Sequence, residues 1–129
     1  MSSTINGTKI RLTRGDSFWA TSTPVYRDGT PYQKQTHDVV RFALKSAELL
    51  PDGSDFADGE PLVEKELVYD STNGYWVLHL VPSDTAELAF GDYRYDIELS
   101  TNWDSTEEKN TDAYTYIANA KFKLTPEVE

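Results

Sequence analysis

Apolar and polar residues alternate at period two in several segments of this chain, the pattern that half-buried β-strands produce. In YRYDIEL, residues 93–99, two tyrosines, an isoleucine and a leucine alternate with arginine, aspartate and glutamate. In VRFALK, residues 40–45, Val40, Phe42 and Leu44 share one side, while the other side carries two charged residues and a small alanine. Both segments are therefore predicted to be strands with one face toward water.

Five further segments carry weaker forms of the same signal. YTYIANAKFKL, residues 114–124, keeps its aromatic and small apolar residues in one phase, which only Ile117 breaks. YWVLHLV, residues 75–81, is apolar in both phases, which predicts a central strand covered on both faces. Three more segments are rich in β-branched or aromatic residues and end at turn formers: TKIRL (8–12), SFWATSTPV (17–25) and LVEKELVY (62–69).

Turn-forming residues lie between these segments. Asn73-Gly74 separates two predicted strands and favours a short hairpin. PSDTAELA, residues 82–89, is the one helical pattern, because a proline precedes Asp84 and Glu87 at the spacing of a capping box. It predicts a corner helix of one or two turns.

Seven short strands, one corner helix and no long helix predict a single all-β domain over residues 1–129, an antiparallel sandwich of two sheets. A small barrel is the alternative, because strand count alone does not show whether a sheet closes. Two polar connections, residues 51–61 and 101–113, are expected to be loops. The polar ends, residues 1–7 and 125–129, are expected to be loose.

Charge and composition exclude several partners. The chain has 22 acidic and 12 basic residues, and its net charge of −10 repels the phosphate backbone of nucleic acid. The absence of cysteine excludes disulfides, thiolate nucleophiles and zinc-thiolate sites, and fits a chain that matures in a reducing cytoplasm. No segment has the apolar run of a signal peptide or of a membrane span, so neither export nor a membrane is expected.

No motif in the sequence identifies an enzyme. The two histidines, His37 and His79, are 42 positions apart, and no serine lies in a nucleophile elbow. The loop 51–61 contains four carboxylates and invites a calcium reading, but its spacing does not match an EF-hand, which favours a solvated loop. No catalytic residue, metal ion or cofactor is therefore expected.

The tripeptide Arg14-Gly15-Asp16 raises the alternative of an adhesin. It lies between two predicted strands, where the glycine supplies the positive φ of a tight reversal and Asp16 can bond the nearby backbone. A turn explains these three residues without a receptor, so the tripeptide is interpreted as structural.

Aromatic residues are the other candidates for binding. Trp19 and Trp76 lie in predicted strands and are expected to fill the core. Trp103 lies in the polar connection 101–113, where it is either an exposed contact residue or a plug over the end of the sandwich. Trp103 with its neighbour Asp104, and Phe56 in the acidic loop, are the candidate interface residues, because an apolar side chain in a polar loop either tucks inward or meets a partner.

The order of five segments resembles a known group of proteins. These segments are RGDSF, VYRDGTPY, VVRFALKSA, LVPSDTAELAFGDYRYDIEL and ANAKFKLTPEV, and together they run nearly the length of the chain. They resemble small immunoglobulin-like domains of tailed bacteriophages and prophages, related to the N-terminal domain of baseplate upper proteins. The most specific part is the span 82–99, in which Gly91 leads into a strand. The resemblance gives Tyr93 the tyrosine-corner role and places Tyr95 where antibody domains carry a cysteine.

The resemblance implies a structural protein of the virion, made in the bacterial host cytoplasm and located in the tail, baseplate or neck. It implies binding to other phage structural proteins, with a homo-oligomer as a further option, and no catalytic residues. The alternative from another class is a carbohydrate-binding module that stacks exposed aromatics on sugar rings.

Overall fold

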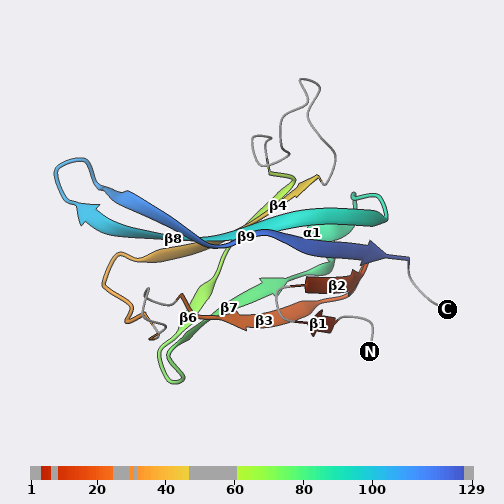
Figure 1. Cartoon of the computed structure of the whole chain (residues 1–129), viewed down its shortest axis with the longest axis horizontal. Coiled ribbons are helices and arrows are strands. Elements are labelled where there is room, and N and C mark those ends of the chain that lie inside the picture. Colours follow the sequence, from red (N-terminus) through yellow and green to blue (C-terminus); the bar gives the residue numbers. More distant parts are fainter. Residues whose placement is uncertain (1–3, 7–8, 25–29, 31, 47–60, 127–129) are drawn as a thin grey trace.

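The computed structural model describes residues 4–6, 9–24, 30, 32–46 and 61–126. Within these residues two sheets pack face to face, which confirms the predicted all-β sandwich (Figure 1). The larger sheet has the strand order β1-β2-β9-β8-β4-β5, and the smaller sheet has the order β3-β7-β6. The bounds are Thr4–Asn6 (β1), Lys9–Thr13 (β2), Phe18–Ser22 (β3), Val39–Ser46 (β4), Val63–Glu66 (β5), Val68–Asp70 (β6), Tyr75–Leu80 (β7), Gly91–Asp104 (β8) and Lys109–Thr125 (β9).

The strand order follows the immunoglobulin arrangement. That arrangement places strands C, F and G in one sheet and strands B, E and D in the other. Here β4, β8 and β9 are neighbours in the larger sheet, while β3, β7 and β6 form the smaller one. Strand β2 pairs with β9 in parallel, and the other pairings between these described strands are antiparallel. The parallel pairing brings the two ends of the described chain together.

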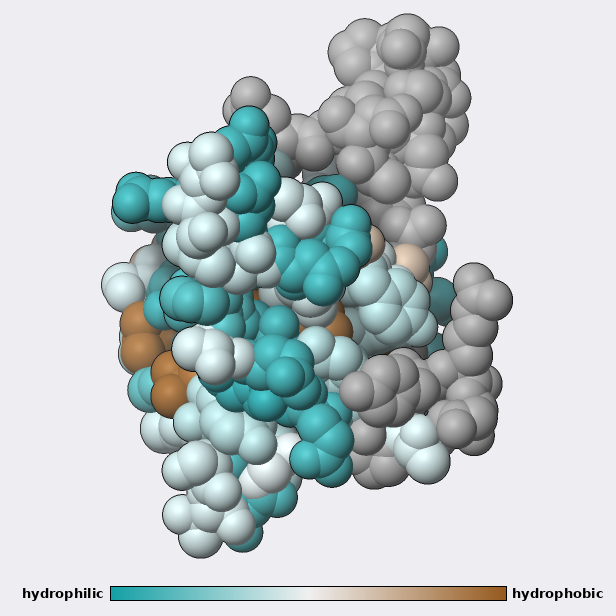
Figure 2. Space-filling model, turned by 90° about the vertical axis from the view of Figure 1, so that its left-hand side faces the viewer, coloured by the Kyte–Doolittle hydropathy of each residue, from teal (hydrophilic) through white to brown (hydrophobic). Residues whose placement is uncertain are grey.

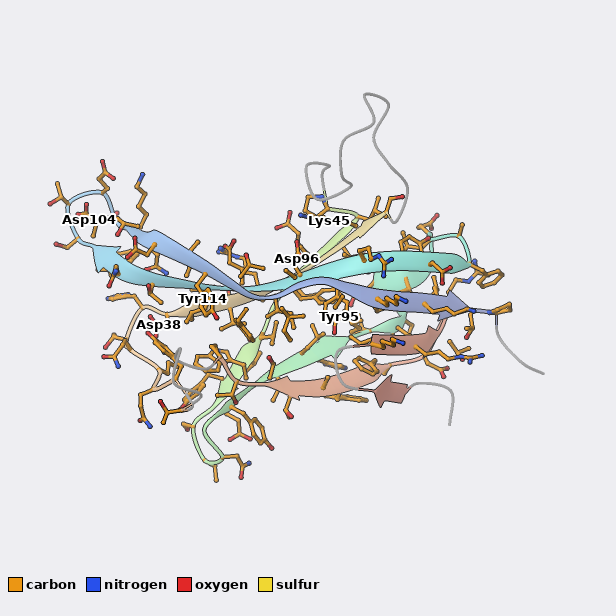
Figure 3. All side chains as sticks on the ribbon, viewed as in Figure 1. Asp38, Lys45, Tyr95, Asp96, Asp104 and Tyr114 are labelled. Atoms are coloured by element: carbon orange, nitrogen blue, oxygen red, sulfur yellow. The ribbon has the colours of Figure 1, made fainter. Side chains whose placement is uncertain are left out.

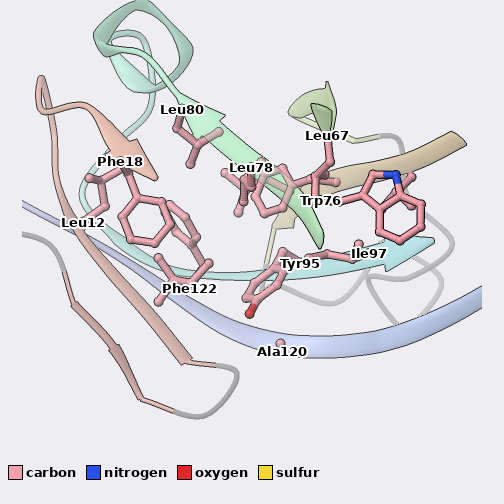
Figure 4. Packing of buried hydrophobic residues seen from close by; sticks show 14 of the residues in the cluster. Leu12, Phe18, Leu67, Trp76, Leu78, Leu80, Tyr95, Ile97, Ala120 and Phe122 are labelled. Atoms are coloured by element: carbon pink, nitrogen blue, oxygen red, sulfur yellow. The ribbon is translucent and has the colours of Figure 1, made fainter. Parts of the chain in front are cut away.

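The core lies between the two sheets and is built from the inward residues of the alternating segments (Figure 4). Phe42, Tyr95 and Phe122 come from three neighbouring strands of the larger sheet and pack ring against ring, with centroids 5.4 to 6.5 Å apart. Trp76 joins the same cluster from the smaller sheet, is 1% exposed and lies with its ring 4.8 Å from that of Tyr69. Burying these large aromatics supplies much of the hydrophobic stabilisation of a sandwich.

The segment predicted as one strand over 62–69 is two strands in different sheets. Strand β5 pairs with β4 in the larger sheet, and β6 pairs with β7 in the smaller sheet. Leu67 lies at the crossing, where it is 3% exposed and its N–H donates to the carbonyl of Val40. A segment rich in β-branched and aromatic residues therefore hid a change of sheet, because no turn former stands at Leu67, which is buried.

The predicted corner helix is present as α1, Pro82–Thr85, between β7 and β8. The predicted pairing of Asp84 with Glu87 as a capping box is wrong. Asp84 instead accepts the N–H of Val81 at 2.8 Å, and its carboxylate lies 3.0 Å from Lys65 Nζ. Asp84 thus caps the helix from its third position and links the corner to β5.

The expected loose ends contain residues that belong to strands. Thr4–Asn6 forms β1 and pairs with β2, and Thr125 ends β9 as a buried residue. The Thr125 hydroxyl lies 3.3 Å from that of Thr13, which joins β9 to β2 across the parallel pair. The sheet therefore extends further toward both ends of the chain than the polarity of these residues predicts.

Strands β8 and β9 also extend through the connection 101–113 that was expected to be a loop. Beyond Ser100 they pair only with each other and form a hairpin arm, residues 101–113, that projects past the rest of the larger sheet (Figure 1). The prediction failed because both faces of the arm are polar, so no alternation marks it. Two register shifts, one on each side of Ile97, separate the arm from the core part of the hairpin.

Candidate functional site

The hairpin arm carries Trp103 to one end of the sandwich. Its ring stacks on His37, with centroids 4.3 Å apart and planes 17° from parallel, and 42% of the residue stays exposed. His37 belongs to the connection between β3 and β4. In an antibody variable domain the equivalent loops, B–C and F–G, form part of the binding end, so this end is a candidate site by analogy of fold.

Hydrogen bonds fix the base of the arm to this connection. Asn110 on β9 donates through its side-chain nitrogen to the carbonyls of His37 and Ser100, at 2.8 and 3.2 Å. Asp38, which is 8% exposed, accepts from the Tyr32 hydroxyl and from the backbone of Gln35, both at 2.7 Å. The stacked pair therefore stands on a braced support.

Two hollows flank the stacked rings of His37 and Trp103. One has a volume of about 540 Å³ and is lined on the β4 side by residues that include Arg41, Ser100 and Lys109. The other, of about 430 Å³, is lined mainly by the connection 32–38 and residues 101–103. Polar side chains dominate both, so Trp103 is an exposed aromatic between two polar recesses. Of the two alternatives for Trp103, this placement favours an exposed contact residue over a plug at the end of the sandwich.

The other two candidate interface residues have different outcomes. Asp104 lies at the tip of the hairpin arm, where its carboxylate accepts the N–H of Thr106 at 2.9 Å and that of Glu107 at 3.4 Å (Figure 3). Its carboxylate therefore shapes the turn. Phe56 and residues 51–60 of the acidic loop lie outside the described residues.

The outer face of the smaller sheet is a second candidate surface, and the sequence prediction missed it. Trp19 was expected in the core, but it is 62% exposed because Phe18 takes the inward phase of β3. Trp19 pairs across the strands with His79, and their rings stack at 4.2 Å. Val68 on β6 faces the same side and is 70% exposed.

This outer face is poor in charge. Its residues are Trp19, Thr21, Val68, Asp70, Tyr75, Val77 and His79, and only Asp70 among them is Asp, Glu, Lys or Arg. Asp70 lies at the edge and accepts the N–H groups of Thr72 and Asn73. The end of the molecule seen in Figure 2, by contrast, is mostly hydrophilic, with brown areas that are small. Depletion of charge together with exposed aromatics is the mark of an interface core.

The tripeptide Arg14-Gly15-Asp16 forms the turn between β2 and β3. Gly15 has a φ of 92°, and the N–H of Asp16 donates to the carbonyl of Thr13 at 3.1 Å. The Arg14 guanidinium lies 4.2 Å from the centre of the Phe90 ring and donates to the Leu88 carbonyl at 3.4 Å. These contacts hold the arginine against the corner that follows α1.

The residues named for the structural corner make the contacts of a tyrosine corner. The Tyr93 hydroxyl donates to the carbonyl of Ala89 at 2.6 Å, four residues upstream, and Gly91 between them has a φ of 140°. Tyr95, two residues on, is 1% exposed, and burial raises its pKa to about 12. A partly buried tyrosine, Tyr116, shares a hydrogen bond with Ser22 across the two sheets at 2.9 Å, and desolvation raises its pKa to about 12 as well.

Two kinds of feature are absent from the described part of the chain. Residues 4–6, 9–24, 30, 32–46 and 61–126 contain no group of three or more histidines and carboxylates arranged to hold a metal ion. The helices of the same residues include none with the length and apolarity to span a bilayer.

Comparison of the chain with protein-family models, curated proteins and solved structures finds no match.

Proposed function

We propose that this chain is a non-enzymatic structural protein of a phage or prophage particle, in the tail, baseplate or neck, that works through contacts with neighbouring proteins of the particle. The segment order that resembles phage immunoglobulin-like domains supports the particle assignment. The outer face of the smaller sheet supports the mode of action.

The observation that carries this proposal is the exposure of Trp19 on a face almost without charge. Charged residues make up 26% of the chain, yet among the described residues of this face Asp70, at the edge, is the only Asp, Glu, Lys or Arg. Trp and Tyr are enriched in interface cores, and truncating a central Trp commonly costs 2 kcal/mol or more of binding, roughly thirtyfold in affinity. Trp19 is therefore the proposed anchor, and Val68 extends its contact.

The test is incorporation into particles. Particles from cells that produce the encoding phage or prophage are purified on a density gradient, and the chain is quantified by mass spectrometry against a major particle protein. We expect the wild-type chain at a fixed ratio in the particle fraction. The double variant Trp19→Ser, Val68→Ser should be incorporated at least tenfold less, because it removes the anchor without touching the core.

Tyr114→Ser is the matched control, since Tyr114 is 51% exposed but belongs to β9 in the larger sheet and not to the outer face of the smaller one. It should be incorporated like wild type. Absence of the wild-type chain from purified particles would refute the particle assignment. Equal incorporation of the Trp19 variant and the control would instead refute the assignment of the surface.

A carbohydrate-binding module is the second candidate, and the surroundings of Trp103 favour it. An exposed indole beside polar recesses offers a ring for sugar stacking and donors and acceptors for hydroxyls. Glycan-array binding by the wild-type chain that is lost in Trp103→Ala and kept in Trp19→Ser would support this function. No array signal for the wild-type chain would remove it.

A further inference from the structure

The outer face of the larger sheet is rich in charged residues, whereas that of the smaller sheet is poor in them. At one corner of this face, strands β2, β9 and β8 bring together five cationic residues. We call this group the cationic half; it consists of Lys9, Arg11, Arg94, Lys121 and Lys123. These five are among only 12 Lys and Arg residues in the chain. These five residues line a hollow of about 390 Å³, and Asp92 is the one acid among the described residues that line it with them.

The positions of these cations follow from the strand register. Arg11 lies opposite Lys123, and Lys121 lies opposite Arg94. Like charges directly opposite on neighbouring strands destabilise a sheet. None of the five cations makes an ion pair within 4 Å with another residue that the structure describes. The arrangement therefore costs stability in the isolated chain, and a partner that supplies carboxylates would offset that cost.

The diagonally opposite corner of the same face carries the opposite charge. Strands β8 and β5 place there three carboxylates, the acidic half: Glu64, Glu66 and Glu98. Arg41 lies opposite both Glu66 and Glu98 in the register. Between the two halves, Lys45 and Asp96 form an ion pair at 3.2 Å (Figure 3).

A face with one positive and one negative half is complementary to itself. A two-fold axis lying in the contact plane turns one copy over, so that each cationic half meets the acidic half of the other copy. Two-fold contacts are the commonest in soluble homo-oligomers, and they use the same patch on both subunits. We propose that the outer face of the larger sheet binds a second copy of this chain in this manner.

This inference goes beyond the proposed function, because it concerns the opposite sheet and does not use the particle assignment. The face offers roughly 20 by 20 Å between strand positions, less than the ~800 Å² per partner of a standard interface. The dimer is therefore expected to be weak, with a dissociation constant of about 10 µM or more.

The experiment is analytical ultracentrifugation of the full chain from about 5 to 500 µM at 150 mM salt, where a Debye length of about 8 Å screens the repulsion between two net charges of −10. Lys121→Glu with Lys123→Glu cancels the charge of the cationic half. Glu64→Lys with Glu66→Lys makes the acidic half positive. Each variant alone should associate at least tenfold more weakly than wild type. In a two-fold dimer both copies carry the substitutions, so each charge reversal weakens two contacts.

Mixing the two variants tests the pairing itself. A mixed dimer keeps one native contact, between the cationic half of the acidic-half variant and the acidic half of the other. The equimolar mixture should therefore associate at least tenfold more tightly than either variant alone. A misfolded variant would not be rescued in this way, so rescue also shows that both variants are folded.

Lys34→Glu with Lys109→Glu is the control. Each change of lysine to glutamate lowers the net charge by two, so this variant has a net charge of −14 in place of −10, the same as the Lys121, Lys123 variant. It should associate within twofold of wild type, as should Trp19→Ser. A monomer throughout the concentration range, a mixture no tighter than its components, or loss of the dimer in either control would overturn the proposal. Loss in Trp19→Ser alone would assign self-association to the smaller sheet and leave the particle test unaffected.

Discussion

Replacing Tyr93 by phenylalanine isolates the hydrogen bond of the tyrosine corner. The change removes the hydroxyl that donates to Ala89 at 2.6 Å and keeps the ring, which meets Phe122 edge-on at 6.5 Å between centroids. A typical intramolecular hydrogen bond contributes about 1 kcal/mol net. Because Ala89 is exposed, water can satisfy the freed carbonyl, and the larger cost of a buried unsatisfied group does not arise. The free energy of unfolding should therefore fall by about 1 kcal/mol.

Urea unfolding followed by circular dichroism measures this loss. With an unfolding entropy of about 2 cal/mol/K per residue, a loss of 1 kcal/mol lowers the Tm of a domain this size by about 4 °C. Tyr114→Phe is the control, since Tyr114 is 51% exposed, and it should change stability by less than about 0.5 kcal/mol. Equal stabilities for the Tyr93 variant and this control would refute the assignment of a structural role to the corner.

Three further predictions concern the core and two titrating groups. Phe42→Ala should lower stability by about 3 to 5 kcal/mol in urea unfolding, because Phe42 is fully buried against Tyr95 and Phe122; a loss under ~1 kcal/mol would contradict the packing. Burial raises the pKa of Tyr95 from 10.0 to about 12. The stabilisation from the protonated Tyr95 is therefore complete below pH 10 and is lost as the pH rises to 12, which lowers the free energy of unfolding by about 3 kcal/mol. Tyr95→Phe should flatten this alkaline fall in stability. The hydrogen bonds from Asn73 lower the pKa of Asp70 below 3.8, so stability should fall with pH below that value, more in wild type than in Asp70→Asn.

Most of the strands could be predicted from the sequence, because a strand buried on one face alternates apolar and polar residues. The pattern over 40–45 and 93–99 corresponds to the buried alternation of β4 and β8. The hairpin at Asn73-Gly74 joins β6 to β7, and Gly74 has a φ of 78°. Turn chemistry and one-sided burial are local signals, so a single sequence carries them.

The failures arose where burial depends on neighbours that are distant in the chain. In β3 both phases contain an aromatic residue, so the sequence does not tell whether Phe18 or Trp19 points inward. In β9 the first register shift beside Ile97 reverses the phase and the second restores it, so Tyr114 lies opposite the buried Leu99, yet it is 51% exposed. Neither feature has a signature in the residues themselves.

The candidate sites likewise differ in whether the sequence alone reveals them. Trp103 was found from sequence, because an indole in a polar segment stands out. The cationic half was not, because its residues come from three parts of the chain. The parallel pairing of β2 with β9 sets Arg11 beside Lys123, and the antiparallel pairing of β8 adds Arg94. Such a cluster becomes visible only with the strand register.

Hydroxyl-radical footprinting of the chain, free and within purified particles, tests the proposed role most directly. Trypsin cleaves after Arg14, Arg27, Arg94 and Lys109, so the peptides 15–27 and 95–109 report on Trp19 and Trp103 separately. We predict that particle assembly lowers the oxidation rate of Trp19 at least fivefold while that of Trp103 changes by less than twofold. Oxidation of Trp19 at the same rate in the particle and in the free chain would contradict the account.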